Sequence, residues 1–269
     1  MADFPFPHTY ISVEALEGSQ DDLTTQIISG AASTKGSYIE IIASTTQEYH
    51  GLIVYGRKTG GDSIVATDIA IGSAGNEEII IPDFAISGYN SFAESSKGFF
   101  PVYIPAGSRV SARSACFIAS SSAYMHLVGV AASGSGNEAR TVKTYGVGSA
   151  FSGITVDPGG TANTKGAWSQ ITSSTTDEIR QIEIYMGKFS NTVDADASFL
   201  LDIGIGGAGS EEVLISNIVF ASNTNEKLNG GLAVIPINIP AGTRIAARCQ
   251  SSITDATDRV MSVSISGVS

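Results

Sequence analysis

The chain contains one pattern of motifs twice, and this duplication limits what it can fold into. Residues 100–113 read FPVYIPAGSRVSAR, and residues 235–248 repeat them as IPINIPAGTRIAAR. Two further motifs recur in the same order, TKG of residues 34–36 at 164–166 and DIAIGSAGNEE of residues 68–78 as DIGIGGAGSEE. Three motifs in one order predict a duplicated domain rather than a solenoid, which uses shorter and more numerous units.

The distance between matching motifs grows along the chain. It is 130 residues for the first motif (164 − 34), 134 for the second (202 − 68) and 135 for the third (235 − 100). Insertions of this kind fall in loops between segments of a kept framework. We therefore predict two domains, at residues 1–131 and 142–269, joined by a Gly/Ser-rich linker at residues 132–141.

Composition excludes several classes of protein. The 269 residues include 15 Lys and Arg against 26 Asp and Glu, giving a net charge of −11. Nucleic acid and anionic membranes attract basic proteins, so neither is expected as a partner. No apolar run approaches the ~20 residues of a transmembrane helix. The first residues lack the basic and apolar regions of a signal peptide, so we expect synthesis in a cytoplasm.

Apolar residues recur at every second position. Positions 110, 112, 114 and 116 carry Val, Ala, Ser and Cys, whereas positions 109, 111 and 113 carry Arg, Ser and Arg. This is the period of a β-strand, and it returns in copy two. Residues 63–71 with 78–86, and 197–205 with 211–220, predict hairpins closed by Gly-rich turns. With no amphipathic helical segment, the predicted fold class is all-β, with two tandem antiparallel β-sandwich domains that are jelly-roll-like.

The sequence offers little catalytic chemistry. The Gly-rich turns lack the Lys-Ser/Thr of a P-loop, and none of the three histidines is repeated, which argues against a Ser/His/Asp site. Cys116 and Cys249 are predicted to be buried free thiols, with an interdomain disulfide as the alternative. Asp194, Asp196 and Asp202 carry oxygens that suit Ca²⁺, but the spacing is not that of an EF-hand. We expect no metal, no cofactor and no enzymatic activity.

Four repeated arginines lie on one face of their predicted strands. Two strand residues four apart are separated by roughly 13 Å. Repeated acids near the turns are candidate partners, so we predict a salt-bridge framework within each sandwich or between subunits, with binding of an anionic ligand as the alternative. The candidate residues are Arg109, Arg113, Arg244, Arg248, Glu77, Glu78, Glu211 and Glu212.

Aromatic residues supply candidate contact points. Tyr38 and Trp168, the only Trp, occupy equivalent positions, and sugar rings pack on exposed aromatic faces. We consider this pair either a glycan-stacking platform or part of the core. Phe4 and Phe6 belong to a Phe-Pro-Phe-Pro segment that cannot be helical, and they are candidate anchors of an extended N-terminal arm. Phe99 and Phe100 are further candidate anchors.

Residues 239–251, IPAGTRIAARCQS, together with DIGIGGAGSEE at 202–212, resemble accessory virion proteins of tailed bacteriophages. The resemblance covers roughly residues 68–116 and 202–251, the later part of each copy. Turn and framework residues carry it, so it transfers no catalytic or binding residue. It implies a structural protein of the virion, either a capsid decoration (cement) protein or a tail, fibre or baseplate component.

The expected function follows from these features together. We predict a non-enzymatic phage structural protein that is made in the host cytoplasm, resides in the virion, binds other virion proteins and forms a homo-oligomer. The alternative is a carbohydrate-binding module that attaches to host-surface glycans. A hydrolase is less favoured, because the paired carboxylates of such enzymes must lie close together and no such pair is visible.

Overall fold

The computed structural model describes residues 9–16, 25–58, 64–86, 96–133, 140–148, 153–187, 197–222, 228–229, 234–254 and 260–269. Within these ranges, no helix is long and apolar enough to span a bilayer. Phe4, Phe6, Asp194, Asp196 and most of the predicted linker lie outside them.

The first copy folds into two antiparallel sheets. One, the β9 sheet, runs in the order β1 (Thr9–Leu16), β9 (Ser122–Ser133), β4 (Gly51–Lys58) and β7 (Ser96–Phe100), with β2 (Thr25–Ile28) also paired to β9. The other, the β5 sheet, runs in the order β3 (Ile39–Ile42), β8 (Val110–Ala115), β5 (Val65–Ile71) and β6 (Glu78–Ile86).

The second copy repeats this arrangement. Its β19 sheet contains β10 (Val142–Tyr145), β19 (Met261–Val268), β13 (Ile179–Gly187) and β16 (Leu228–Asn229), with β11 (Ile154–Val156) on β19 and β17 (Ile235–Ile239) on β13. Its β14 sheet runs in the order β12 (Ser169–Thr172), β18 (Ile245–Ser251), β14 (Ala197–Ile205) and β15 (Glu212–Ser222).

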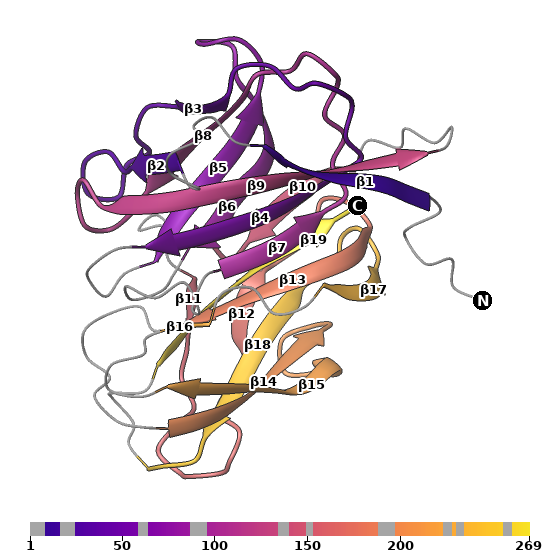
Figure 1. The fold of residues 1–269 in the computed structure, drawn as a ribbon. Helices are drawn as coiled ribbons and strands as arrows, with labels where there is room; N and C mark the ends of the chain where they lie inside the picture. Colours follow the sequence, from indigo (N-terminus) through magenta and orange to yellow (C-terminus); the bar gives the residue numbers. More distant parts are fainter. Residues whose placement is uncertain are drawn as a thin grey trace.

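The strand order confirms the predicted fold class. If the short β2 is left out, the first, eighth, third and sixth strands of copy one share one sheet, and the second, seventh, fourth and fifth share the other. This is the connectivity of a jelly roll, and copy two has the same order when the short strands β11 and β16 are left out. The described residues are therefore all-β and form two tandem antiparallel sandwiches (Figure 1).

Each sandwich encloses a core built by the two-residue alternation. In copy one, Leu52 and Ile69 come from opposite sheets and both are fully buried. Ile182 and Ile203 are their counterparts in position and burial in copy two. Burying a side chain of this size contributes ~1.5–3 kcal/mol. The free thiols of Cys116 and Cys249 are buried too, as predicted.

The turns between β5 and β6 and between β14 and β15 are hairpin turns, as the sequence predicts. Gly72 and Gly75 have φ of 114° and 86°, and their counterparts Gly206 and Gly209 have 107° and 82°. Only glycine adopts such values without strain, which explains why both copies keep these residues.

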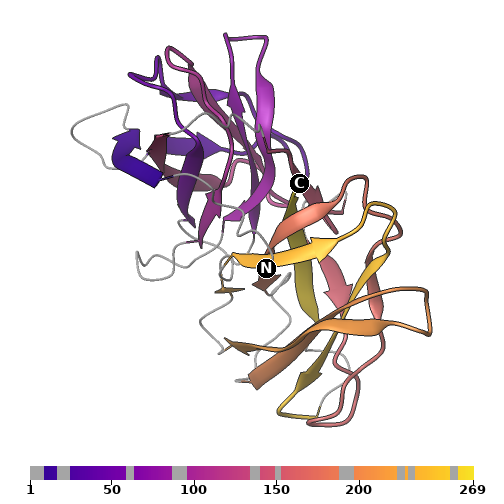
Figure 2. The ribbon, with the colours of Figure 1, turned by 90° about the vertical axis from the view of Figure 1, so that its right-hand side faces the viewer.

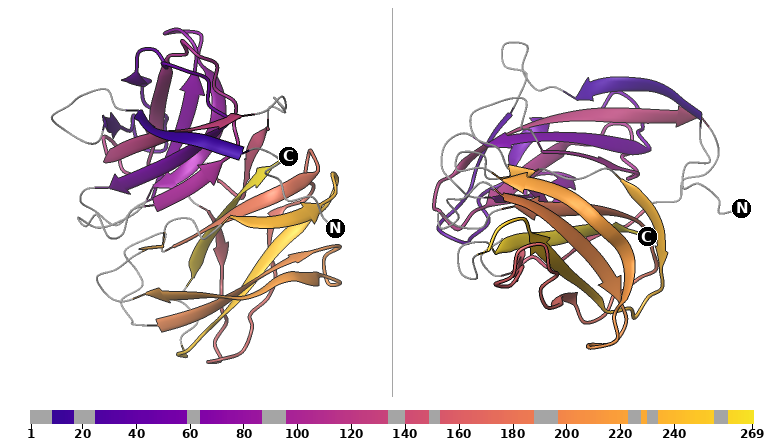
Figure 3. Two further views of the ribbon diagram at one scale, coloured as in Figure 1. Left: turned by 45° about the vertical axis from the view of Figure 1, so that its right-hand side comes forward. Right: turned by 90° about the horizontal axis from the view of Figure 1, so that it is seen from below.

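The two sandwiches are stacked on each other. The β19 sheet of copy two lies against the side of copy one where β6 and β7 form the edges of the two sheets (Figures 1 and 2). Val142, Tyr185 and Val268 of copy two belong to the same buried apolar cluster as Phe84 and Phe100 of copy one. The C-terminus lies close to this junction (Figure 3). The core of copy one is thus completed by side chains of copy two.

Candidate functional site

A buried carboxylate organises the outer face of the β5 sheet. Asp68 on β5 lies opposite Arg113 on β8, and Arg113 Nε donates to Asp68 Oδ2 at 3.0 Å. Lys35 Nζ donates to Asp68 Oδ1 at 2.8 Å, and the amide of Asp83 donates to the same oxygen at 3.1 Å. One aspartate therefore joins β5, β6, β8 and the segment before β3.

Copy two repeats this cluster around Asp202. Lys165 Nζ and Arg248 Nε lie 2.6 and 3.0 Å from its two oxygens, and the amide of Asn217 donates at 2.9 Å. Burial acts to raise the pKa of Asp202, but the hydrogen bonds from Lys165, Asn217 and Arg248 outweigh it and hold the pKa below its ordinary value. The carboxylate therefore stays charged and paired.

Tyr38 and Trp168 cover these clusters. The guanidinium of Arg113 lies 4.7 Å from the ring centre of Tyr38, and that of Arg248 lies 4.5 Å from the ring centre of Trp168. Both rings are half-buried on the outer face of their sheets, outside the core. Cation–π stacking therefore orients each ring through the arginine that also binds the aspartate.

A second repeated ion cluster holds each hairpin turn. Arg109 Nη1 donates to Glu77 at 3.2 Å, and Arg109 Nε donates to Glu40 at 2.8 Å. In copy two, Arg244 donates to Glu211 at 2.9 Å and to Gln170 at 3.0 Å. Each arginine also donates to the first glycine carbonyl of its turn.

The four predicted arginines thus divide between two kinds of partner. Arg109 and Arg244 pair with glutamates at the turns, whereas Arg113 and Arg248 pair with Asp68 and Asp202 rather than with Glu78 and Glu212. The strand register explains this, because Asp68 lies directly opposite Arg113 while Glu78 lies opposite Ile71 at the far end of the hairpin. Glu78 and Glu212 are exposed.

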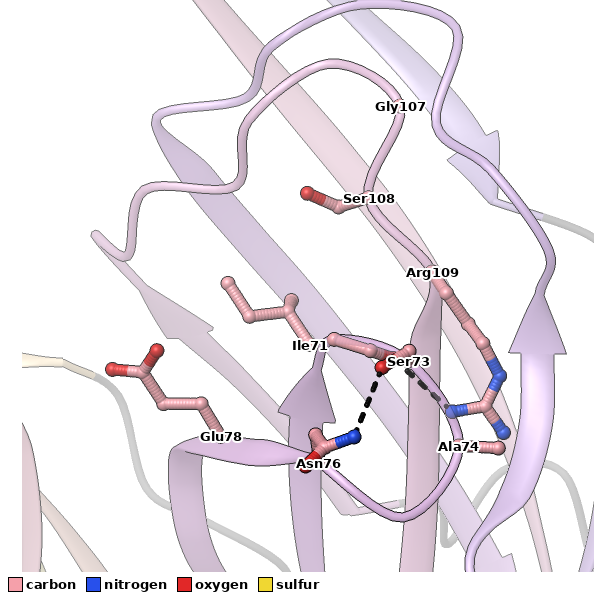
Figure 4. Close-up of a pocket in the computed structure, with 9 residues that line it drawn as sticks. Ile71, Ser73, Ala74, Asn76, Glu78, Gly107, Ser108 and Arg109 are labelled. Carbon is pink, nitrogen blue, oxygen red and sulfur yellow. Dashed lines mark hydrogen bonds between the residues drawn. The ribbon is translucent and has the colours of Figure 1, made fainter.

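A surface hollow of about 480 Å³ lies beside the first hairpin turn (Figure 4). Ser73, Asn76 and Glu78 line it from the turn, and Gly107 and Arg109 line it from the Pro-Ala-Gly bend. Asn76 is within 3.4 Å of Ser73 Oγ, and Arg109 is engaged as described above. Asn76 and Arg109 therefore help to hold the turn in shape.

The junction between the copies contains a polar contact that the sequence analysis missed. Glu183 on β13 accepts a hydrogen bond from the amide of Phe99 at 2.9 Å, and Gln181 donates to the carbonyl of Phe99 at 3.2 Å. These two side chains therefore bind the free backbone edge of β7. Tyr185 donates to Glu183 Oε2 at 2.8 Å, and its ring meets Phe84 edge-on at 5.8 Å.

Burial controls the ionisation of this junction. Glu183 is 0% exposed, and desolvation raises the pKa of its carboxyl from 4.5 to about 8, despite hydrogen bonds from Tyr185 and Phe99 that favour the charged form. Desolvation, together with the adjacent carboxylate, also raises the pKa of Tyr185 well above its ordinary value. The protonated carboxylic acid is thus the stable form of Glu183 at neutral pH.

The remaining candidates are placed as follows. Phe100, considered as an anchor for partners, is fully buried in the core and cannot contact one, whereas Phe99 is half-buried beside the junction. Among the described residues, no three His, Cys, Asp or Glu side chains are grouped as a metal site would require.

Known proteins give only distant similarities. No protein-family profile and no curated protein matches the chain. Over 96% of its length it is similar to PNGF-II, with 8% identity and a TM-score of 0.35, and it spans 64% of that protein. It is also similar to the N-terminal CBM22-1-CBM22-2 tandem domain of Paenibacillus barcinonensis Xyn10C (97% of this chain, 92% of that one, 9% identity, TM-score 0.27). The VP2 subviral particle of infectious bursal disease virus is a third (97% and 72%, 14% identity, TM-score 0.29). Similarities at this level identify no function.

The first prediction concerns the pH dependence of stability. Because folding raises the pKa of Glu183 from 4.5 to about 8, the native state binds more protons than the unfolded state between these values. The free energy of unfolding therefore falls as pH rises through this range. In Glu183→Gln, we expect the free energy of unfolding to lose the part of its fall with pH that comes from Glu183. This variant should be more stable than the wild type above pH 8, as measured by urea unfolding at several pH values.

The exposed Glu212→Gln provides the control for the loss of one negative charge. Parallel stability curves for the wild type and Glu183→Gln across the whole pH range would contradict the buried-acid assignment.

The second prediction concerns how Trp168 fits its sheet. A Cβ at Gly204 would lie 2.6 Å from the Trp168 ring, whereas copy one has the pair Tyr38 and Ala70 at these positions. Gly204→Ala should therefore destabilise the protein by about 1–3 kcal/mol. Adding Trp168→Tyr should recover part of this loss, giving a coupling of about 0.5–3 kcal/mol in a double-mutant cycle. Additive effects would show that the two positions do not depend on each other.

Proposed function

We propose that this chain is a non-enzymatic structural protein of a virus particle, of the tailed-bacteriophage type, that binds other virion proteins as a capsid decoration or tail-associated component. The observation that carries the proposal is the buried junction between its two sandwiches. Tyr185 packs against Phe84, and Gln181 and Glu183 bind the edge of β7, so the two copies are joined by buried contacts.

A fixed pair of similar domains suits a repetitive surface. When two binding modules are held at one spacing, the second engages with little further loss of entropy, provided that the partner offers sites at the same spacing. A shell or tube built from many identical subunits provides such sites, because symmetry repeats each surface patch at constant intervals.

The repeated charged residues support a structural role as well. Lys35, Asp68 and Arg113, like their counterparts in copy two, are engaged with one another across the strands. Arg109 and Arg244 hold the turns. The residues that the duplication kept are therefore those that fix the shape of each sandwich.

The proposal predicts stoichiometric binding to particles. Purified protein added to phage particles that lack it should sediment with them and saturate at a fixed ratio to the major capsid or tail subunit. Separated heads and tails in the same gradient would assign the location. Protein that stays at the top of the gradient at every concentration would contradict the proposal.

A second candidate function is glycan binding at Trp168 and Tyr38. Each half-buried ring lies beside a partly exposed arginine. The side chain of Arg248, beside Trp168, is 30% exposed, and that of Arg113, beside Tyr38, is 32% exposed. A partly exposed ring next to a hydrogen-bond donor has the chemistry that recognises a sugar.

Because Trp168 is the only Trp, its fluorescence reports directly on this site. If the site binds glycans, oligosaccharides from host surfaces should shift the emission in a saturable way, and Arg248→Lys should weaken binding while leaving the fold intact. Emission that is unchanged by every glycan tested would rule out this candidate at copy two.

A further inference from the structure

The junction joins two surfaces, and the duplication places a counterpart of each elsewhere on the chain. The first, which we call the plug face, is the outer face of the β19 sheet around Tyr185. The second, the β6–β7 side, is the side of the first sandwich where Phe84 and Phe100 border its core. The Tyr185 ring closes this side by meeting Phe84 edge-on, and Phe84 meets Phe100 in the same way at 6.0 Å.

The counterpart of the plug face is present on copy one and is exposed. Tyr55 on β4 corresponds to Tyr185 on β13 (185 − 55 = 130), and both pair with the last long strand of their copy, Tyr55 with His126 and Tyr185 with Ser264. Tyr185 is 3% exposed, whereas Tyr55 is 37% exposed. The same side chain at the same strand position is therefore buried in one copy and accessible in the other.

His126 and Lys97 lie directly opposite Tyr55 on the flanking strands, and two further neighbours of Tyr55 are apolar. Ile53 stands where copy two has Glu183, and Val128 lies opposite Ile53 on β9. Both are half-buried. The outer face of a sheet that meets only water gains nothing from such residues, whereas a face covered by a partner does.

The counterpart of the β6–β7 side is also present, on copy two. Ile218 on β15 corresponds to Phe84 (218 − 84 = 134), and Ile235 on β17 corresponds to Phe100 (235 − 100 = 135). Phe84 and Phe100 are 0% exposed because Tyr185 and its neighbours cover them, whereas Ile218 and Ile235 are only half-buried at the border of the second core. We call this surface the β15–β17 side.

The rim of the β15–β17 side is apolar too. Val219, next to Ile218, is 64% exposed, more than the other large apolar side chains of the described residues. Its counterpart in copy one, Ala85, is 8% exposed. Copy two therefore leaves accessible an apolar surface that copy one covers.

From these four surfaces we infer that the chain associates with itself head to tail. The exposed face around Tyr55 of one molecule, the counterpart of the plug face, covers the β15–β17 side of the next molecule. Tyr55 then approaches Ile218 as Tyr185 approaches Phe84 within the chain. This inference goes beyond the proposed function and does not depend on it.

A second copy of this chain is the occupant that fits best, because the contact already exists within each molecule. The two surfaces belong to jelly rolls of the same topology, and the strand registers around Tyr55 and Ile218 match those around Tyr185 and Phe84 at the junction. Such a contact is heterologous, so repeating it builds a ring if the rotation closes and a filament if it does not. The net charge of −11 opposes association, so screening by salt should favour it.

Sedimentation velocity on the purified protein tests this inference. The wild type should form species larger than the monomer as concentration and salt rise. Tyr55→Lys and Ile218→Lys should each lose this association, and Val219→Lys serves in place of Ile218→Lys if that variant does not fold. Val213→Lys is the matched control, because Val213 is 40% exposed and so is its counterpart Ile79, which places both outside the junction.

Mixing the variants gives the decisive result. Tyr55→Lys keeps an intact β15–β17 side, and Ile218→Lys keeps an intact face around Tyr55. An equimolar mixture should therefore form dimers that cannot grow further. A wild type that stays monomeric throughout, single variants that assemble like the wild type, or a mixture that stays monomeric would each overturn the inference. The experiment contains no virus particle, so its outcome is independent of the particle-binding test.

Discussion

The structure depends on one contact, in which side chains of the second sandwich bind the backbone edge of the first. An edge strand such as β7 presents unpaired N–H and C=O groups that invite pairing with another chain. Glu183 accepts a hydrogen bond from the N–H of Phe99, and Gln181 donates one to its C=O. Tyr185 closes the core beside them. The first sandwich is therefore complete only with the second in place.

The buried acid in this contact contributes more to the correct alignment of β13 along β7 than to the stability of the junction. A carboxyl group that is removed from water gains little net stability from its hydrogen bonds, and leaving it without partners would be costly. Glu183 meets its partners only when β13 lies in one position along β7, so a shifted arrangement is penalised. The protonated state that burial imposes lowers this cost at neutral pH, and it also makes the junction sensitive to alkaline conditions.

The sequence predicted the elements that repetition and periodicity encode. Alternation of apolar residues and the Gly-rich turns predicted the sandwich fold and a hairpin of residues 63–71 with 78–86, which the structure places at 65–71 with 78–86. The sequence offers Glu77 as a partner of Arg109 because both residues are repeated charged residues of opposite sign, and the two form an ion pair. The partner of Arg113 was missed, although Asp68 and Lys35 are repeated charged residues of opposite sign, because strand register decides which of several distant charges meet.

The junction could not be predicted because it lies where the repeat fails. Glu183 has Ile53 as its counterpart and Gln181 has Gly51, so a search for shared residues passes over both. Residues shared by the two copies show how each sandwich is built, and residues that differ show which surfaces each sandwich uses for contacts. Tyr55 and Tyr185 are informative in both ways, because the same residue is exposed in one copy and buried in the other. After a duplication, a surface that is kept in both copies but covered in only one indicates where a further molecule can bind.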